Sequence, residues 1–138
     1  MIAPAFMNNS RLRELIHEVT DSVIDDQPGF WKFEYDGQLV FVITDESHNR
    51  MRIICPIVEA GEVSQKEWMT MMSANFDRAL DARYCINNET LWSAFIHPLE
   101  ELASHQFRDA LKQVVTLASN FGTSYSSGNL VFGGDGDG

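Results

Sequence analysis

The chain has 138 residues, of which 44% are hydrophobic and 22% charged, a length and composition that suit one globular domain. Its 20 acidic residues outnumber 10 Lys and Arg and give a formal net charge of −10; such a field repels polyanions, so no nucleic-acid partner is expected. No apolar run approaches the roughly 20 residues that span a bilayer, and the N-terminal stretch lacks the basic region of a secretory signal, so we expect a cytoplasmic protein with no membrane partner.

The first predicted element is an amphipathic helix over residues 10–26. Apolar side chains recur there at helical spacing, namely Leu12, Leu15, Ile16, Val19 and Val23. Asn9 or Ser10 has the kind of side chain that accepts hydrogen bonds at a helix N-cap. The stretch QPGF at 27–30 then ends the helix, because Pro and Gly interrupt helical backbone.

A β-hairpin is predicted next, in the stretch FWKFEYDGQLVFVIT. The dipeptide Asp36-Gly37 between two β-rich runs is a strong hairpin signal, since tight hairpin turns need residues that tolerate positive φ. A two-residue turn there sets Phe33 opposite Val40. Residues 39–43, LVFVI, are apolar on both faces, which predicts a strand in the middle of the sheet.

A third strand is predicted over residues 51–58, MRIICPIV. Pro56 has no N–H to donate to a neighbouring strand, so the strand either ends near Pro56 or runs along an edge of the sheet. A free edge can accept an extended peptide through main-chain hydrogen bonds. We therefore expect a candidate peptide-binding edge here, flanked by Arg50 and Arg52.

A second helix is predicted from the capping box formed by Ser64 and Glu67 to about Leu80. Its large apolar side chains are Trp68, Met69, Met71, Met72 and Phe76. They spread around more of the helix than packing on a single sheet requires. An exposed apolar patch on this helix would indicate a protein–protein interface.

A second hairpin joins residues 82–87 to residues 91–96, with the turn near Asn88-Glu89. Pro98 suits the first turn of a helix, and helical spacing of apolar residues predicts a closing helix to about Asn120.

The predicted order is α-β-β-β-α-β-β-α, and two hairpins imply an α+β fold with helices packed on a largely antiparallel sheet. Residues 1–9 are expected to form an N-terminal arm, and residues 10–122 a single domain. Gly122 is expected to adopt the left-handed conformation after the closing helix. The Gly- and Ser-rich residues 123–138 are expected to be a flexible tail.

No signature of catalysis is present: the chain lacks a phosphate-binding loop, an HExxH sequence and a nucleophile elbow. Glu101, His105 and Asp109 share one predicted helix face and have spacing that suits a metal or an acid–base pair, but a solvated polar face has the same spacing and is the favoured interpretation. Cys55 and Cys85 lie in predicted strands and are expected to be buried free thiols. We therefore predict no catalytic residue, no metal and no cofactor, and keep an enzyme with an unrecognised pocket as a weaker alternative.

The order of elements and three stretches of sequence resemble the type III secretion chaperone-like fold, a group that includes the Tir chaperone family and the YbjN-like proteins. The stretches are FEYDGQLVFVI, MRIICPIVE and SANFDRALDARYCINNETLWSAF. With the closing helix, the resemblance covers about residues 10–121. The spacing from Asn75 to Trp92 is most similar to the YbjN-like branch.

The resemblance implies a small homodimer that binds an extended segment of a partner protein. It places the partner-binding groove at Leu15, Val19, Val23, Phe33 and Phe41, and the dimer interface at Trp68, Met69, Met72 and Phe76. For each of these residues outside the second helix, packing in the core of the domain is the favoured single explanation. The dimer could form through the second helix or through the sheet. The alternative function is a YbjN-like regulatory or adaptor protein without a role in secretion.

Overall fold

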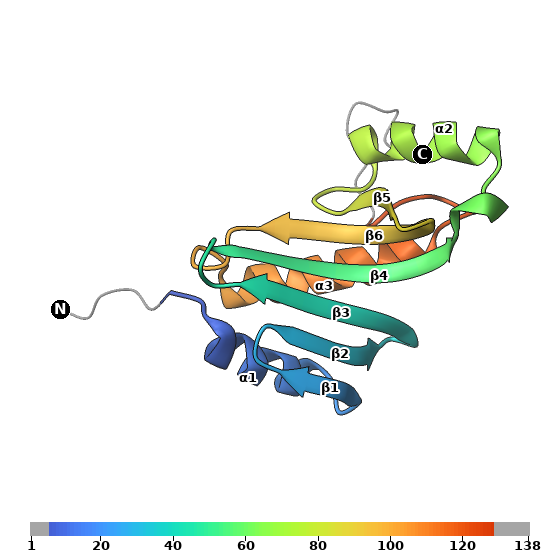
Figure 1. Cartoon of the computed structure of the whole chain (residues 1–138). Helices are drawn as coiled ribbons and strands as arrows, with labels where there is room; N and C mark the ends of the chain where they lie inside the picture. Colours follow the sequence, from blue (N-terminus) through green and yellow to red (C-terminus); the bar gives the residue numbers. More distant parts are fainter. Residues whose placement is uncertain (1–5, 129–138) are drawn as a thin grey trace.

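The structure of the protein is a computed structural model that describes residues 6–128. In this part of the chain, helices lie against a single antiparallel sheet, as the α+β prediction states (Figure 1). The elements are α1 (Asn9–Val19), β1 (Val23–Gln27), β2 (Phe30–Tyr35), β3 (Gln38–Asp45), β4 (Arg50–Glu59), a 3₁₀ turn (Ala60–Glu62), α2 (Gln65–Asp77), β5 (Arg83–Asn87), β6 (Thr90–His97) and α3 (Ser104–Ser119). The strands lie in the order β1-β2-β3-β4-β6-β5.

The first helix is shorter than predicted, because α1 ends at Val19 rather than at residue 26. Thr20 is already extended, and its hydroxyl donates a hydrogen bond of 2.6 Å to the backbone oxygen of Glu34 on β2. Val23 therefore lies on an additional strand, β1, instead of on the helix. The β-branched pair Val23 and Ile24 suits a strand, and pairing with β2 overrides the helical periodicity.

The start of α1 is also one residue earlier than predicted. The side chain of Asn8, rather than Asn9 or Ser10, caps the helix by accepting a hydrogen bond from the backbone N–H of Arg11 at 3.0 Å. Met7 is buried, and its N–H donates to the backbone oxygen of Glu100. The described end of the expected N-terminal arm is therefore packed on the domain.

The first hairpin is confirmed in both turn and register. Asp36 and Gly37 have φ values of 52° and 79°, the left-handed pair that a tight two-residue turn requires. Phe33 lies opposite Val40. As predicted, β3 is an internal strand of the sheet.

The expectation that the strand containing Pro56 is an edge is wrong. This strand, β4, lies between β3 and β6 in the middle of the sheet. Its register with β6 shifts between Pro56 and Val58, and a bulge of this kind tolerates a residue that has no N–H for the ladder. An edge for peptide binding must therefore be sought on β1 or β5.

The second hairpin turns at Asn88 and Glu89, as predicted, with φ values of 50° and 64°. The closing helix starts at Ser104, six residues later than Pro98. The intervening residues form a turn that buries Leu99 and Leu102.

Past α3, Gly122 has the expected left-handed φ of 87°. The tail was expected to be flexible from residue 123, but residues 123–128 contact the domain. Tyr125 packs against Tyr84 with ring centroids 6.2 Å apart, and Ser127 bonds to the backbone of Arg78 and Ala79. Residues 129–138 lie outside the described residues.

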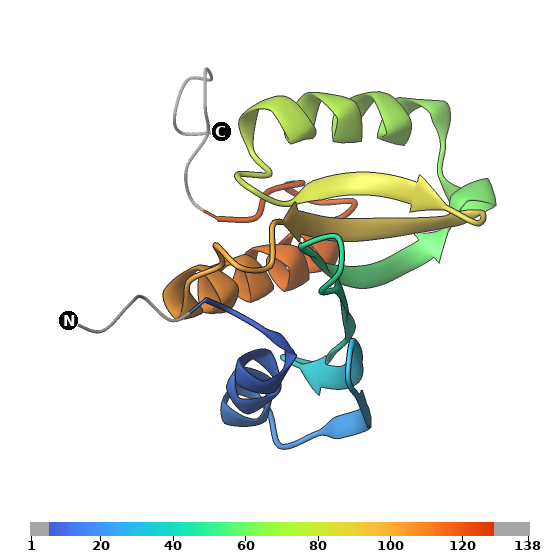
Figure 2. The same ribbon diagram turned by 60° about the vertical axis from the view of Figure 1, so that its left-hand side comes forward.

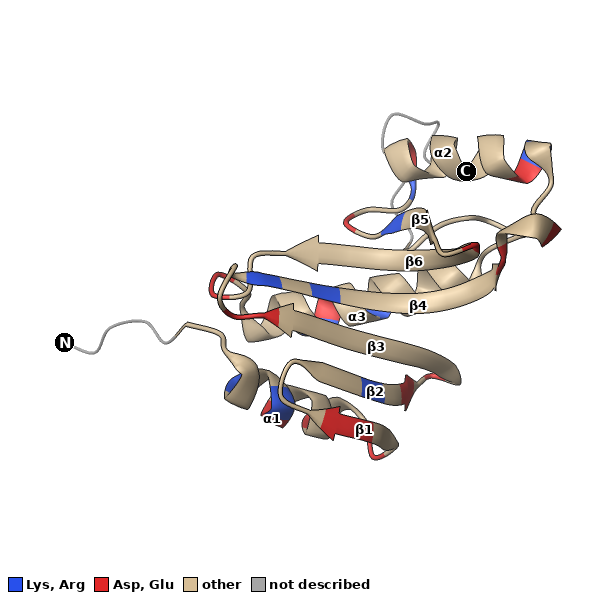
Figure 3. Ribbon diagram, viewed as in Figure 1, with Lys and Arg blue, Asp and Glu red and all other residues tan. Residues whose placement is uncertain are grey.

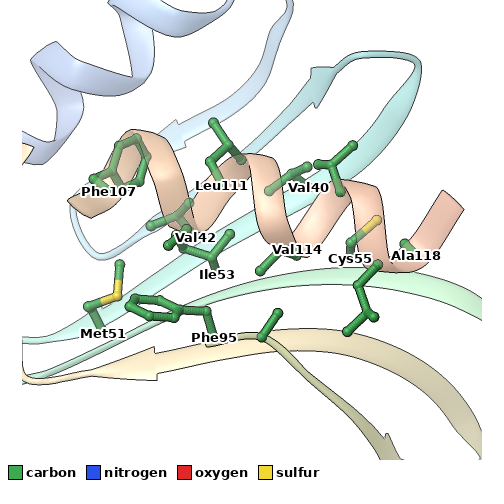
Figure 4. Close-up of a cluster of buried hydrophobic side chains, with 14 of the residues drawn as sticks. Val40, Val42, Met51, Ile53, Cys55, Phe95, Phe107, Leu111, Val114 and Ala118 are labelled. Carbon is green, nitrogen blue, oxygen red and sulfur yellow. The ribbon is translucent and has the colours of Figure 1, made fainter. Parts of the chain in front are cut away.

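Helices α1 and α3 cover one side of the sheet, which we call the closed face (Figures 1 and 2). The strands contribute a continuous apolar layer to this face, made of Trp31, Phe33, Val40, Val42, Met51, Ile53, Cys55 and Phe95. Figure 4 shows part of this layer beneath Phe107, Leu111, Val114 and Ala118 of α3. Most of the core therefore lies between the sheet and these two helices. Helix α2 packs along the edge strand β5 and adds Met71 and Ala74 to the core.

Candidate functional site

The helix α2 carries an exposed apolar stripe, formed by Met69, Met72 and Phe76. These side chains are 65%, 66% and 84% exposed, and their spacing of three and four residues places them on one side of the helix. The capping box at Ser64 and Glu67 is present as predicted, with hydrogen bonds of 3.1 and 2.9 Å that start the helix. A well-formed helix thus presents large apolar side chains to solvent.

The opposite side of α2 supplies the contact with the domain. Met71 and Ala74 are buried in the core, and Trp68 is partly buried against it. Of the four residues predicted for a dimer interface, the α2 stripe therefore contains three, whereas Trp68 is mainly a packing residue. Such a stripe on a soluble protein is typical of an interface.

The edge strand β5 is closed by a side chain of α2. The amide of Asn75 accepts a hydrogen bond of 2.8 Å from the backbone N–H of Tyr84, and donates one of 3.1 Å to the backbone oxygen of Tyr84. Asn75 thus satisfies this backbone as a neighbouring strand would, which protects the edge from pairing with another chain. Sequence reasoning used Asn75 only as part of the family resemblance, and the structure supplies its physical role.

The edge strand β1 is open by comparison. In the described part of the chain it pairs only with β2, and its register with β2 is irregular between Val23 and Asp25. Ile24 is 56% exposed on this strand. Val19 and Val23 are partly buried beside it, so an apolar border follows the open edge.

The remaining residues of the predicted groove are not gathered at this edge. Leu15 and Phe33 are buried in the core, and neither is accessible to a partner in this conformation. Phe41 lies on the opposite side of the sheet, because it is paired with Lys32 and Ile54 rather than pointing toward α1. The family resemblance implied one groove with five apolar residues, whereas the structure brings only Val19 and Val23 to the β1 edge.

A polar cluster holds α1 against β1 and β2. The carboxylate of Asp26 accepts hydrogen bonds from His17 at 2.8 Å, from Arg13 at 3.0 Å and from the indole N–H of Trp31 at 3.0 Å. The bonds from His17 and Arg13 lower the pKa of Asp26 below its usual value. Every group of the cluster has a structural partner, so we assign the cluster to the packing of α1.

A hollow with a volume of about 470 Å³ lies at the end of α1. Its lining residues include four acidic ones, Glu18, Asp21, Glu34 and Asp36. Burial, followed by the negative charge of Asp36, raises the pKa of Tyr35 beside it. The hollow contains no Cys or His to act as a nucleophile or base.

The polar residues predicted to share a helix face do not form a site. Glu101 lies before α3 and accepts a hydrogen bond from Asn49, while His105 and Asp109 are exposed on the helix. Among residues 6–128, no group of three His, Cys, Asp or Glu side chains is arranged to hold a metal ion. Over the same residues, no helix has the length and apolar character needed to cross a membrane.

The two cysteines differ, although both were expected to be buried. Cys55 lies on the closed face, and burial raises its pKa to about 12. Cys85 is exposed, because β5 is an edge strand and no helix covers this side of it. Both thiols are free, as predicted.

Three solved structures resemble this chain over most of its length. A chain of the HopA1–SchA chaperone–effector complex has a TM-score of 0.62 at 9% identity, covering 81% of this chain and 90% of its own. A chain of the ExsC–ExsE complex has a TM-score of 0.59 at 14% identity, and the match covers 81% of this chain and 92% of that one. The third structure is the complex between the Yersinia pestis type III secretion chaperone SycH and a stable fragment of YscM2. One of its chains has a TM-score of 0.60 at 13% identity, and the match covers 82% of this chain and 98% of that one.

No protein-family model matches the chain, and no curated protein matches it either. At identities of 9–14% the structural similarity establishes the fold alone. The chain therefore has the type III secretion chaperone-like fold, as the resemblance in its sequence implied.

Proposed function

We propose that the protein is a non-catalytic, cytoplasmic homodimer that binds an extended segment of a partner protein. The observation that carries the proposal is the α2 stripe, because Met69, Met72 and Phe76 are exposed on a helix whose other side already completes the core. Covering these side chains with a second copy removes apolar surface from water, which favours association.

The fold supports the proposal that the protein binds an extended segment of a partner. Two of the three similar structures are described as complexes of a chaperone with an effector or a protein fragment. In this chain the β5 edge is occupied by Asn75, which leaves β1 as the edge that can accept an extended segment. Ile24, with Val19 and Val23 beside it, offers the apolar contacts for the side chains of such a segment.

The dimer is tested by sedimentation velocity of the wild type and of Phe76→Glu at micromolar concentration. We expect a dimer for the wild type and a monomer for the variant, since the introduced carboxylate would have to be buried in the interface. His105→Glu makes the same change of charge on an exposed site of α3 and should remain dimeric. A monomeric wild type would overturn the dimer.

The partner segment is tested with a photo-crosslinking amino acid at position 24 or, as the control, at position 105. In the native host, position 24 should crosslink to one extended segment of another protein, identified by mass spectrometry, and position 105 should not. Crosslinks only to folded domains would favour the YbjN-like adaptor alternative and contradict the binding of an extended segment.

A further inference from the structure

The side of the sheet opposite the closed face, which we call the open face, has no helix packed across it in the described structure (Figures 1 and 2). A row of apolar side chains nevertheless crosses it. Phe41 contacts Phe30 and Trp92 in edge-to-face geometry, with ring centroids 6.0 Å apart in both pairs. Ile54 lies opposite Phe41 on β4, and Ile96 on β6 is 59% exposed.

Cations border this apolar row. The ammonium of Lys32 lies 5.8 Å from the ring centroid of Phe41. Arg52 lies between Ile43 and Ile96 in the register of the sheet, and Arg50 is two residues away on the same side of β4. Figure 3 shows these positions as blue bands on β2 and β4.

The cations of the open face have no carboxylate partner within residues 6–128, although the chain has twice as many acidic as basic residues. Other arginines are paired: Arg13 with Asp26, Arg78 with Asp77, and Arg108 with Glu18. By contrast, Lys32, Arg50 and Arg52 form none of the ion pairs in this part of the structure.

On the edge strand β1, Asp25 lies opposite Lys32 in the register of the sheet, and its carboxylate accepts a hydrogen bond of 3.0 Å from Gln27. Asp45 is opposite Arg50, but its oxygens accept hydrogen bonds from Ser47 and His48. Glu34 lies near the far end of β2. The part of the open face around Arg52 and Ile54 on β4 is therefore positive and apolar, whereas the molecule as a whole is strongly negative.

We propose that the open face binds an acidic segment of a partner protein in which carboxylates alternate with apolar side chains. Its carboxylates would pair with Lys32, Arg50 and Arg52, while its apolar side chains would pack on Phe41 and Trp92. Charge complementarity selects this occupant, because a second copy of the chain would bring the same cations face to face. The open face is distinct from the β1 edge, so an experiment that contradicts one of the two proposals does not contradict the other.

The test is fluorescence anisotropy with the full chain and two labelled peptides that alternate Val and Phe with either Glu or Lys. We expect the Glu peptide to bind, and its affinity to fall as salt is added, since salt screens surface charges. The double variant Arg50→Glu/Arg52→Glu should bind it about tenfold more weakly, because each attraction becomes a repulsion. Lys66→Glu/Lys112→Glu makes the same change of charge elsewhere and should weaken binding by less than about threefold.

Lys32→Glu, a single change on another strand, should weaken binding in the same direction and guards against a double variant that fails to fold. Equal binding of the Lys peptide, or equal loss in both double variants, would overturn the proposal. So would a dimer that dissociates in Arg50→Glu/Arg52→Glu, since that result would assign the open face to a second copy. The variant Ile24→Asp, which affects only the β1 edge, should leave binding of the Glu peptide unchanged.

Discussion

The two faces of the sheet are both apolar, but only one of them is covered. Phe33 and Phe41 show the contrast: they lie on adjacent strands, yet Phe33 is buried beneath the helices while Phe41 is partly exposed beside Lys32. Strand alternation decides which residues share a face. It does not decide which face receives the helices, so an apolar face without a helix indicates a surface for a partner.

The largest expected effect of this contrast is on stability. Phe33→Ala should lower the free energy of unfolding by about 3–5 kcal/mol, because it leaves a cavity in the core. Phe41→Ala should cost about 1 kcal/mol, since it removes edge-to-face contacts at a surface that water can reach. Urea denaturation measures both values. Similar losses in the two variants would show that the open face is covered in solution.

The cysteines extend the comparison to chemical reactivity. Cys85 should react with a thiol reagent in the native protein at about pH 8, whereas Cys55 should react at least about a hundredfold more slowly, because its thiolate is rare and its sulfur is buried. A chromogenic disulfide reagent should therefore titrate one thiol before unfolding and two after it. Two rapidly reacting thiols in the native protein would contradict the placement of Cys55 on the closed face.

The closure of β5 by α2 predicts a smaller effect. Asn75→Ala leaves the backbone N–H and oxygen of Tyr84 without partners and should cost about 2 kcal/mol in urea denaturation. Asn87→Ala on the same strand changes an exposed side chain and should cost less than about 0.5 kcal/mol. Because Asn75→Ala opens this edge, it should also increase aggregation on storage.

The smallest effect concerns the contact of α1 with the sheet. The pKa of Asp26 is lowered by hydrogen bonds from His17 and Arg13, so its ionised form stabilises the fold above about pH 4, and this contribution is lost as pH falls through the folded pKa. Asp26→Asn should therefore lower the melting temperature at pH 7 but much less at pH 3. As the control, Asp21→Asn removes an exposed carboxylate nearby and should leave the melting temperature at pH 7 nearly unchanged.

Elements with a local cause were predicted well. The left-handed pair Asp36 and Gly37 determined the first hairpin and its register, and Ser64 with Glu67 determined the start of α2. In both cases the interacting groups are within a few residues of each other. The strand β1 was missed for the opposite reason, because Val23 fits helical spacing and only pairing with β2 makes it a strand.

The candidate site likewise has features that the sequence predicted and features that it did not. The prediction that α2 has more apolar side chains than its packing uses agrees with the exposure of Met69, Met72 and Phe76. The edge assigned to Pro56 was wrong, because a bulge inside the sheet accommodates the missing N–H as well as an edge does. The hydrogen bonds of Asn75 were beyond prediction from spacing, since they join a helix to a strand in three dimensions.

The sequence by itself determined that this protein is an α+β domain with two tight hairpins, a surplus of apolar residues and a large negative charge. These properties depend on residue type and on contacts between near neighbours along the chain. Only the tertiary structure decided that β4 is internal, that Asn75 closes one edge, and that Lys32, Arg50 and Arg52 meet an uncovered apolar face. Those features arise from pairing between distant segments, where several registers satisfy the same hydrophobic pattern and packing of the whole domain selects one.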